Sequence, residues 1–182
     1  DESFVDFSED YMNNTLLDDT ILNNYQNLVV IKCISKSFGV PGLRLGIMAS
    51  ANSNLTDSVK EKLAIWNLNS YAEFFMQIFS KHEADYHKAC NRFIEERKFL
   101  IDGLNKTGIL KVFPSQANFL LCEIVSNHTA KELAKELLCS YNILIKDCSG
   151  KKGFNGRNFI RLAIRNHEDN IKLIEALNSI NK

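Results

Sequence analysis

The 182-residue chain has only two prolines, four histidines and no excess of charge of either sign. Lysine plus arginine and aspartate plus glutamate each number 22, so the formal net charge is zero. A chain without a strongly basic balance lacks the field that attracts nucleic acid or an anionic membrane. We therefore expect no nucleic-acid partner and no membrane partner, and a small molecule becomes the default ligand.

Long apolar runs and paired cysteines are also missing. The longest apolar runs, such as "LVVI" at 28–31, are far shorter than the roughly 20 residues of a membrane-spanning helix. The five cysteines contain no CxxC pair and fit free thiols in a reducing, cytoplasmic compartment, while the histidine spacing predicts no metal site. The opening "DESFVDF" lacks a methionine and the features of a signal peptide, which predicts a fragment of a longer chain.

Short apolar runs near the start of the chain predict an α/β layer. Residues 3–7, 28–35 and 43–49 are rich in β-branched or aromatic side chains and are bounded by turn-forming residues, which is typical of buried strands. The polar segment 8–27 is expected to contain a short helix. Strand, helix and strand followed by a glycine-rich turn is the pattern of an α/β fold.

Helical patterns follow. Residues 56–66 predict a helix capped by Thr56 with Val59, Leu63 and Ile65 on one face, and 72–104 predict a long bridging helix with one break near 80–84. The remaining segments alternate between strand patterns (110–115, 118–124, 143–149 and 158–165) and helix patterns (129–141 and 167–180). We expect a small α+β unit of about four strands and two helices, with a domain boundary near residue 66 that separates 1–66 from 67–182.

The stretch "ISKSFGVPGLRLG" at 34–46 places a lysine and an arginine inside a tight turn rich in glycine. An isolated Ser-Lys pair is most often a surface feature. In a closed site, however, a lysine amine is a nucleophile toward carbonyl carbon. The hydroxyl of Ser35 and the guanidinium of Arg44 could hold a phosphate while Lys36 reacts with an aldehyde. Pyridoxal 5′-phosphate carries both groups and binds lysine as a Schiff base.

The string "SKSFGVPGLRLG" resembles the lysine segment of the fold-type I pyridoxal-phosphate enzymes, the aspartate aminotransferase superfamily. "DESF" at the start of the chain is similar to that family's "DEAY" motif, whose aspartate pairs with the pyridine nitrogen. The resemblance implies that Lys36 is catalytic and that Asp1, Ser35, Lys36 and Arg44 bind the cofactor. Phe4 replaces a tyrosine that contacts the cofactor's ring oxygen, which leaves open which group makes that contact.

"NFIRLAIR" at 158–165 is similar to the strand on which the family carries an arginine for the substrate α-carboxylate. Arg161 is the matched position. Arg165 could hold a second substrate anion or pair with a surface carboxylate, and Asn118 could face the substrate or satisfy the backbone at a strand start. The "WNLNS" segment, with Trp66 and Asn69, resembles the family's junction between the large domain and the bridging helix.

Three strings narrow the resemblance: "VFPSQANFLL", "ILIKDCSGKKGF" and "FIRLAIR". They look most like the threonine-phosphate decarboxylase branch, with its "ILIRDCSN…GL…IRVAIR" pattern and a phenylalanine in the "DEAF" motif. This implies decarboxylation of threonine-phosphate or serine-phosphate; an aminotransferase of the histidinol-phosphate type is the alternative. Lys146, Lys151 and Lys152 could bind the substrate phosphate or belong to a solvated loop.

The resemblance covers nearly the whole chain and implies the C-terminal part of a large α/β domain that binds pyridoxal phosphate, followed by a small C-terminal α+β domain. It also implies a homodimer. In the family, parts of the cofactor site lie ahead of the position matched by Asp1. A non-catalytic fragment that folds and associates is therefore the hypothesis from another class.

Overall fold

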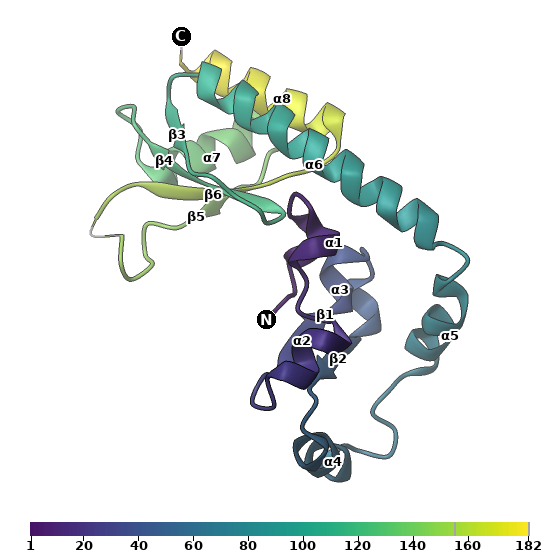
Figure 1. Cartoon of the computed structure of the whole chain (residues 1–182). Coiled ribbons are helices and arrows are strands. Elements are labelled where there is room, and N and C mark those ends of the chain that lie inside the picture. Colours follow the sequence, from purple (N-terminus) through teal and green to yellow (C-terminus); the bar gives the residue numbers. More distant parts are fainter. Residues whose placement is uncertain (155, 182) are drawn as a thin grey trace. The chain divides into compact units, whose positions relative to one another are not determined.

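The computed structural model describes residues 1–154 and 156–181. The chain forms two compact units of mixed helix and strand, Asp1–Cys90 and Asn91–Lys182 (Figure 1). The family-type boundary expected near residue 66 stays a prediction. Within the described ranges, no helix combines the length and the apolar character that crossing a membrane requires.

The first unit is built around a two-stranded antiparallel sheet. Strand β1 pairs with β2 from Val30 opposite Ala49 to Cys33 opposite Gly46, and the lysine loop joins the two strands. The elements of this unit are η1 (Val5–Phe7), α1 (Tyr11–Asn14), α2 (Asp19–Asn24), β1 (Val30–Cys33), α3 (Ile34–Ser37), η2 (Pro41–Leu43), β2 (Gly46–Ala49), α4 (Ser53–Lys62) and α5 (Ser70–Phe79). The predicted strands at 28–35 and 43–49 are thus confirmed over 30–33 and 46–49, although Ile31 and Ile47 are exposed where buried strands were expected.

The prediction of a strand at 3–7 was wrong, because this segment turns back on itself. The backbone N–H groups of Val5, Phe7 and Ser8 donate to carbonyl oxygens three residues earlier, which forms the 3₁₀ turn η1. Turning brings the Asp6 carboxylate to the Lys32 ammonium, a contact between segments that pattern reading treats separately. The polar segment that follows holds two short helices, α1 and α2, where one was expected.

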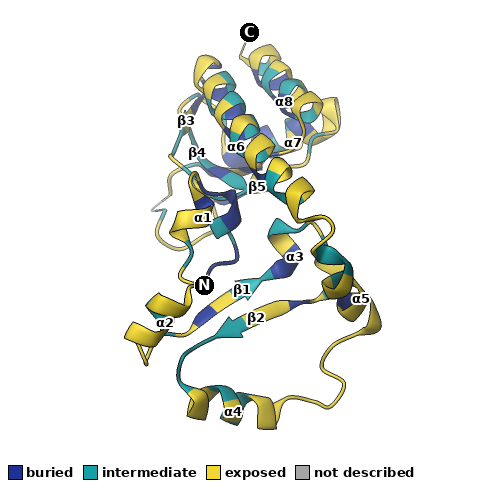
Figure 2. Ribbon diagram, turned by 45° about the vertical axis from the view of Figure 1, so that its right-hand side comes forward, coloured by how far each residue is buried: buried dark blue, intermediate teal, exposed yellow. Residues whose placement is uncertain are grey.

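The helix predicted at 56–66 is displaced toward the N-terminus. Asn52 caps α4 by accepting a hydrogen bond from the backbone N–H of Leu55, and Thr56 lies inside the helix. Leu63 and Ile65 follow the helix and are exposed, so the predicted apolar face does not form (Figure 2). The predicted break in the long helix is confirmed, since α5 ends at Phe79 and α6 (Glu83–Lys106) begins four residues later.

The second unit contains the expected four strands and two helices together with the end of α6. Its antiparallel sheet has the order β3-β4-β6-β5. The elements are β3 (Leu110–Val112), β4 (Phe119–Ile124), α7 (Ala130–Tyr141), β5 (Lys146–Asp147), β6 (Phe159–Ala163) and α8 (His167–Ile180). Thr129 and Glu132 form a capping box that starts α7.

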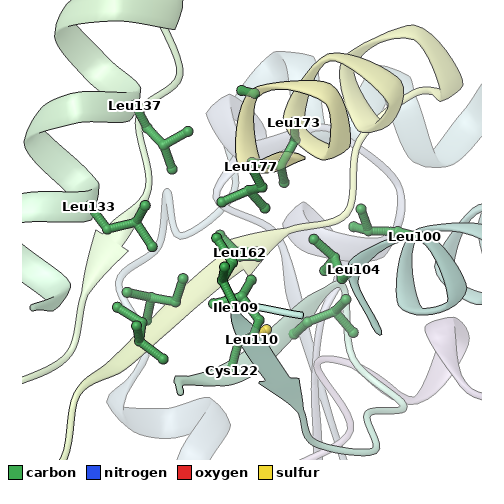
Figure 3. Packing of buried hydrophobic residues seen from close by; sticks show 14 of the residues in the cluster. Leu100, Leu104, Ile109, Leu110, Cys122, Leu133, Leu137, Leu162, Leu173 and Leu177 are labelled. Carbon is green, nitrogen blue, oxygen red and sulfur yellow. The ribbon is translucent and has the colours of Figure 1, made fainter. Parts of the chain in front are cut away.

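Alternation along β4 and β6 places the core of this unit on one face of the sheet. Leu120, Cys122 and Leu162 are buried there against leucines of α6, α7 and α8 (Figure 3). Helix α8 lies beside α6 (Figure 1), and a Cβ built on Gly103 would approach Ile174 Cδ1 to 2.2 Å, so a larger residue there would require the Ile174 side chain to move. The open face, opposite this core, carries Lys111, Glu123 and Arg161 together with the aromatic ring of Phe119.

Candidate functional site

The lysine loop is closed by main-chain contacts at its base. Strand β1 ends at Cys33, α3 follows at once, and the N–H of Ile34 donates to the carbonyl oxygen of Leu45 at 3.1 Å. Gly39 has φ +67°, a conformation that glycine adopts at little cost and that lets the chain reverse after α3. The sequence therefore folds locally into a short helical turn that presents residues 35 and 36 between two paired strands.

Lys36 extends from this turn into an exposed position. Its Nζ lies 4.2 Å from the centroid of the Phe4 ring, which is cation–π geometry. The sequence reading matched both residues to motifs of the same site, and the structure brings them into contact. Phe4, which stands where the similar motif has a tyrosine, therefore presents its ring face to the lysine ammonium.

Ser35 is buried, with 4% of its surface exposed. Its hydroxyl oxygen has no hydrogen-bond partner among the described residues. Leaving a buried hydroxyl unsatisfied costs on the order of 1–3 kcal/mol, a cost that a bound acceptor removes. A phosphate oxygen is such an acceptor, so the chemistry of Ser35 fits the phosphate of the expected cofactor.

Arg44 closes the loop in an unusual backbone conformation. Its φ is +53°, in the left-handed region that few residues other than glycine adopt. The guanidinium is exposed and donates to the Pro41 carbonyl oxygen at 3.3 Å. A planar guanidinium cation is suited to binding an anion such as phosphate. The bond that Arg44 makes here is long and leaves the guanidinium exposed to a ligand.

Asp1 has a carboxylate oxygen fixed by its neighbour. Its Oδ1 accepts hydrogen bonds from the backbone N–H and the hydroxyl of Ser3, at 2.9 and 2.5 Å. The next residue, Glu2, donates its N–H to the carbonyl oxygen of Ile31 at 2.7 Å and so attaches this segment to β1. The predicted cofactor aspartate is therefore anchored to the strand that leads to the lysine.

A buried ion pair lies beneath the same segment. Lys32 Nζ is 2.6 Å from Asp6 Oδ1, and the two side chains are 12% and 7% exposed. The sequence reading missed this pair, although a lysine inside the apolar run "LVVIKCIS" was a signal for a buried partner. Charges this deeply buried are found in proteins when they are paired.

Helix α5 and the first turn of α6 support the loop from another side. Asn69 caps α5 with its side-chain oxygen and donates its amide N–H to the Leu43 carbonyl oxygen at 2.8 Å. Phe38 stacks on Tyr86 with ring centroids 4.2 Å apart, and burial raises the pKa of that tyrosine far above its ordinary value. The tyrosine is therefore a neutral packing group here, and Asn69 is a further residue that shapes the loop.

Arg161 lies on the open face of the four-stranded sheet. It is exposed, and its guanidinium carbon is 5.1 Å from the centroid of the Phe119 ring. Lys146 is its direct partner across β5 and β6, and Leu121 is its partner on β4. The carbonyl oxygen of Asn118 accepts from Ile164 N–H at 3.2 Å, so its backbone continues the pairing. The side-chain role of Asn118 stays a prediction.

Arg165 is engaged on the surface. Its Nε donates to Asp169 Oδ2 at 2.7 Å, an ion pair four residues apart at the start of α8. This is the pairing that the sequence reading gave as its alternative, and a role in holding a second substrate anion stays a prediction. Lys151 and Lys152 are exposed in the loop that precedes the undescribed residue 155.

Comparison with known proteins gives the family. The profile of the aminotransferase class I and II family matches residues 1–177. The chain belongs to this family. Its relatives include pyridoxal-phosphate-dependent decarboxylases and aminotransferases, and family members bind pyridoxal 5′-phosphate.

The proteins to which the chain is similar include both decarboxylases and aminotransferases. An L-serine phosphate decarboxylase from Sulfurospirillum multivorans is 32% identical over 100% of the chain and 47% of its own length. A histidinol-phosphate aminotransferase structure from Clostridium acetobutylicum has a TM-score of 0.82 and 29% identity, covering 98% of this chain and 52% of that one. An L-threonine-O-3-phosphate decarboxylase structure from Porphyromonas gingivalis has a TM-score of 0.81 and 25% identity, with 98% and 53% covered.

The fold therefore matches part of the fold-type I pyridoxal-phosphate enzymes. The chain spans less than half the length of the curated relatives it matches. The residues predicted to bind the cofactor all belong to the first compact unit, and those predicted to bind substrate belong to the second.

Proposed function

We propose that this chain carries the lysine side of a pyridoxal-phosphate site that decarboxylates a phosphorylated amino acid, threonine-phosphate or serine-phosphate. The observation that carries the proposal is the pairing of Lys36 with Ser35. An exposed amine directly follows a buried hydroxyl without a hydrogen-bond partner among the described residues, in a loop that Arg44 closes. An aldehyde that bears a phosphate engages all three side chains.

Each residue of this loop has a distinct part. Lys36 would hold the cofactor through its aldehyde carbon and, when its amine is free, would carry a proton to or from the substrate's Cα. Ser35 and Arg44 would hold the phosphate, and Asp1 would keep the pyridine nitrogen protonated because a carboxylate favours the charged form of a neighbouring group. When bound, pyridoxal phosphate supplies a conjugated ring that accepts the electrons of the bond broken at Cα.

The open sheet face of the second unit supplies the substrate anchors. Arg161 and Lys146 face one another across β5 and β6, and both are exposed. Like charges opposite one another across a sheet repel, so an anion bound between them is favoured. We assign the substrate carboxylate to Arg161 and the phosphate to Lys146, with Arg165 and Asn118 at the margin of the site.

Transamination of histidinol phosphate is the second candidate. A histidinol-phosphate aminotransferase from Archaeoglobus fulgidus is 33% identical over 99% of this chain, a likeness similar to that of the decarboxylases. The two reactions differ in which substituent of Cα is held perpendicular to the cofactor ring, so they need the same functional groups in different orientations. We favour decarboxylation because the strings around Lys146 and Arg161 resemble those of the threonine-phosphate decarboxylase branch.

The resemblance also supports a homodimer. Ile65 and Trp66 are each 91% exposed between α4 and α5, and large exposed apolar side chains are typical of association surfaces. Trp66→Ser is expected to shift the protein toward monomer in sedimentation velocity, whereas Lys62→Ser on the neighbouring helix turn leaves the dimer intact.

Five free cysteines support a reducing compartment.

Cofactor binding is tested by spectroscopy and labelling. Addition of pyridoxal phosphate to the full-length protein should give a visible absorbance band, and borohydride reduction should fix the cofactor on the peptide that contains Lys36. Lys36→Ala should remove the label, while Lys60→Ala, which alters an exposed lysine of α4, keeps it. A label on another lysine overturns the proposal. A label in the full-length protein but not in residues 1–182 alone supports the hypothesis of a non-catalytic fragment.

The reaction is tested with phosphothreonine, phosphoserine and histidinol phosphate, measuring carbon dioxide and keto product separately. Carbon dioxide from either phosphoamino acid supports decarboxylation. Keto product from histidinol phosphate without carbon dioxide from the other two substrates supports the aminotransferase instead.

A further inference from the structure

The N-terminal segment contacts strand β1 at two points. Glu2 N–H donates to the Ile31 carbonyl oxygen at 2.7 Å, and the Asp6 carboxylate pairs with Lys32 at 2.6 Å. Between these two attachments, the Phe4 ring faces Lys36 Nζ at 4.2 Å. We propose that the Phe4 ring is the resting site of the Lys36 ammonium, and that the Asp6–Lys32 ion pair is a positioning pair that holds the ring there.

The turn η1 makes Asp6 and Phe4 move together. Phe7 N–H donates to the Phe4 carbonyl oxygen at 3.1 Å, and Val5 N–H donates to Glu2 at 3.2 Å. The Ser8 hydroxyl closes the turn on the Val5 carbonyl oxygen at 2.7 Å. A 3₁₀ turn this tightly bonded fixes the direction of Phe4 once the Asp6 side chain is fixed.

The ion pair resists separation because both charges are buried. Asp6 Oδ2 has no hydrogen-bond partner in the described part of the chain, so Lys32 is the cation that compensates this carboxylate. Separating the pair would leave a charge in a poorly solvated place, which is costly. Lys32 also lies in β1, the strand that leads directly into the α3 turn with Lys36. The same pair therefore fixes both the strand that leads into Lys36 and the turn that carries Phe4.

The aromatic face restricts where the lysine amine lies. A ring face attracts an ammonium, so in the absence of ligand Phe4 holds the Lys36 amine against the ring and away from other reaction partners. The lysine is thereby held in one place before it meets the cofactor and after it is released.

Competitive labelling of the cofactor-free, full-length protein tests this inference. Lysines are acylated at a fixed pH near 8 and the rate at Lys36 is read by mass spectrometry. Phe4→Leu is expected to raise that rate about 2- to 5-fold, which is the range for loss of a partly exposed cation–π contact. Phe4→Tyr keeps the ring and is expected to match the unmodified protein.

The second unit provides a matched control, because Lys111 Nζ lies 5.5 Å from the Phe113 ring centroid. Phe113→Leu should raise labelling at Lys111 and leave Lys36 unchanged. An unchanged Lys36 rate in Phe4→Leu would overturn the proposed resting site.

The positioning pair is tested by non-additivity. Asp6→Asn is expected to raise Lys36 labelling as much as Phe4→Leu does, and the double variant is expected to show no further rise, because both changes remove the same contact. If Asp6→Asn does not fold, as judged by thermal melting, Asp6→Asn with Lys32→Met leaves no lone buried charge and takes its place. The positioning role is overturned if the protein without the ion pair labels Lys36 at the same rate as the unmodified protein. It is also overturned if the effects of Asp6→Asn and Phe4→Leu on that rate multiply in the double variant.

This inference rests on the proposed function only in that Lys36 is taken to be the cofactor lysine. Labelling is measured without cofactor, so the two proposals can fail separately. Loss of the borohydride label at Lys36 with the Phe4 effect retained would refute the proposed function alone.

Discussion

The two compact units differ in how they treat their apolar residues. In the second, side chains from three helices and both central strands close over one another, and residues such as Leu120, Leu133 and Leu177 have no exposed surface (Figure 3). In the first, a small cluster of Ile34, Leu45 and Ala72 packs beneath the lysine loop. Ile31 and Ile47 of its sheet stay 53% and 44% exposed (Figure 2).

Both units bury polar groups, but they differ in how these groups are arranged. The first unit carries the buried Asp6–Lys32 pair and a Ser35 hydroxyl without a hydrogen-bond partner among the described residues. The second buries Arg97 and Asn170, which are 2% and 1% exposed, and carries exposed cations on a sheet face supported by a dense core. A dense core gives a rigid platform for the side chains that the sheet carries.

The largest effect is expected from removing the lysine of the first unit. Lys36→Ala in the full-length protein should lower kcat by about 10²- to 10⁴-fold, the range for loss of a positioned proton-transfer group. Steady-state assays with phosphothreonine measure this. Lys60→Ala is the control, and comparable losses in both variants would show that the effect is not local.

Substitutions of apolar residues should destabilise the protein more in the second unit than in the first. Leu162→Ala is expected to lower the free energy of unfolding by about 2–5 kcal/mol, because it leaves a cavity where the side chain is 1% exposed. Ile47→Ala, at a half-exposed position of the other sheet, should cost less than about 1 kcal/mol. Urea unfolding followed by circular dichroism compares them. Equal costs would mean that Ile47 is buried in the protein in solution.

Two arginines that are close in sequence, Arg161 and Arg165, should differ in how much they contribute to substrate binding. Arg161→Gln is expected to raise KM about 10- to 100-fold, since hydrogen bonds to charged groups contribute about 1.5–3 kcal/mol. Arg165→Gln breaks an exposed ion pair with Asp169 and should change KM by less than about 5-fold. The reverse order would reassign the carboxylate to Arg165. Thermal melting of both variants serves as the control.

Helix caps provide a matched comparison between the units. Asn69→Ala and Thr129→Ala each remove an N-cap and should each destabilise the protein by about 0.5–2 kcal/mol. Only Asn69 also bonds the lysine loop, through the Leu43 carbonyl oxygen. Fluorescence titration should therefore show weaker pyridoxal-phosphate binding in Asn69→Ala and unchanged binding in Thr129→Ala.

The smallest effect concerns pH. Hydrogen bonds from the backbone N–H and the hydroxyl of Thr129 hold the pKa of Glu132 below its ordinary value of 4.5. A carboxyl with a lowered folded-state pKa stabilises the protein above its unfolded value, and this stabilisation is lost as the pH falls through the folded pKa. The difference in Tm between the unmodified protein and Glu132→Gln should thus shrink as the pH drops below 4.5. A constant difference would contradict the capping-box assignment.

Secondary structure could be predicted from the sequence where residues close together in the chain determine it. The strand at 30–33, the break after Phe79 and the helix predicted at 129–141 each depend on residues within a few positions of one another. The segment 3–7 failed because its conformation is set by a partner in β1, 26 residues away from Asp6. The prediction of helix α4 was wrong by a few residues, since Asn52 and Thr56 are both acceptable caps and it is Asn52 that accepts the hydrogen bond from Leu55 N–H.

The sequence by itself determined the family resemblance, which the profile match confirms, and the succession of strands and helices along residues 110–180. The resemblance rests on short motifs, and the succession of elements follows from turn residues and apolar periodicity, which are also properties of short stretches. Only the tertiary structure decided that Phe4 lies against Lys36, that Lys32 neutralises Asp6, and that Ser35 is buried without a partner among the described residues. Such contacts depend on burial, and burial is created by segments that meet only when the chain has folded.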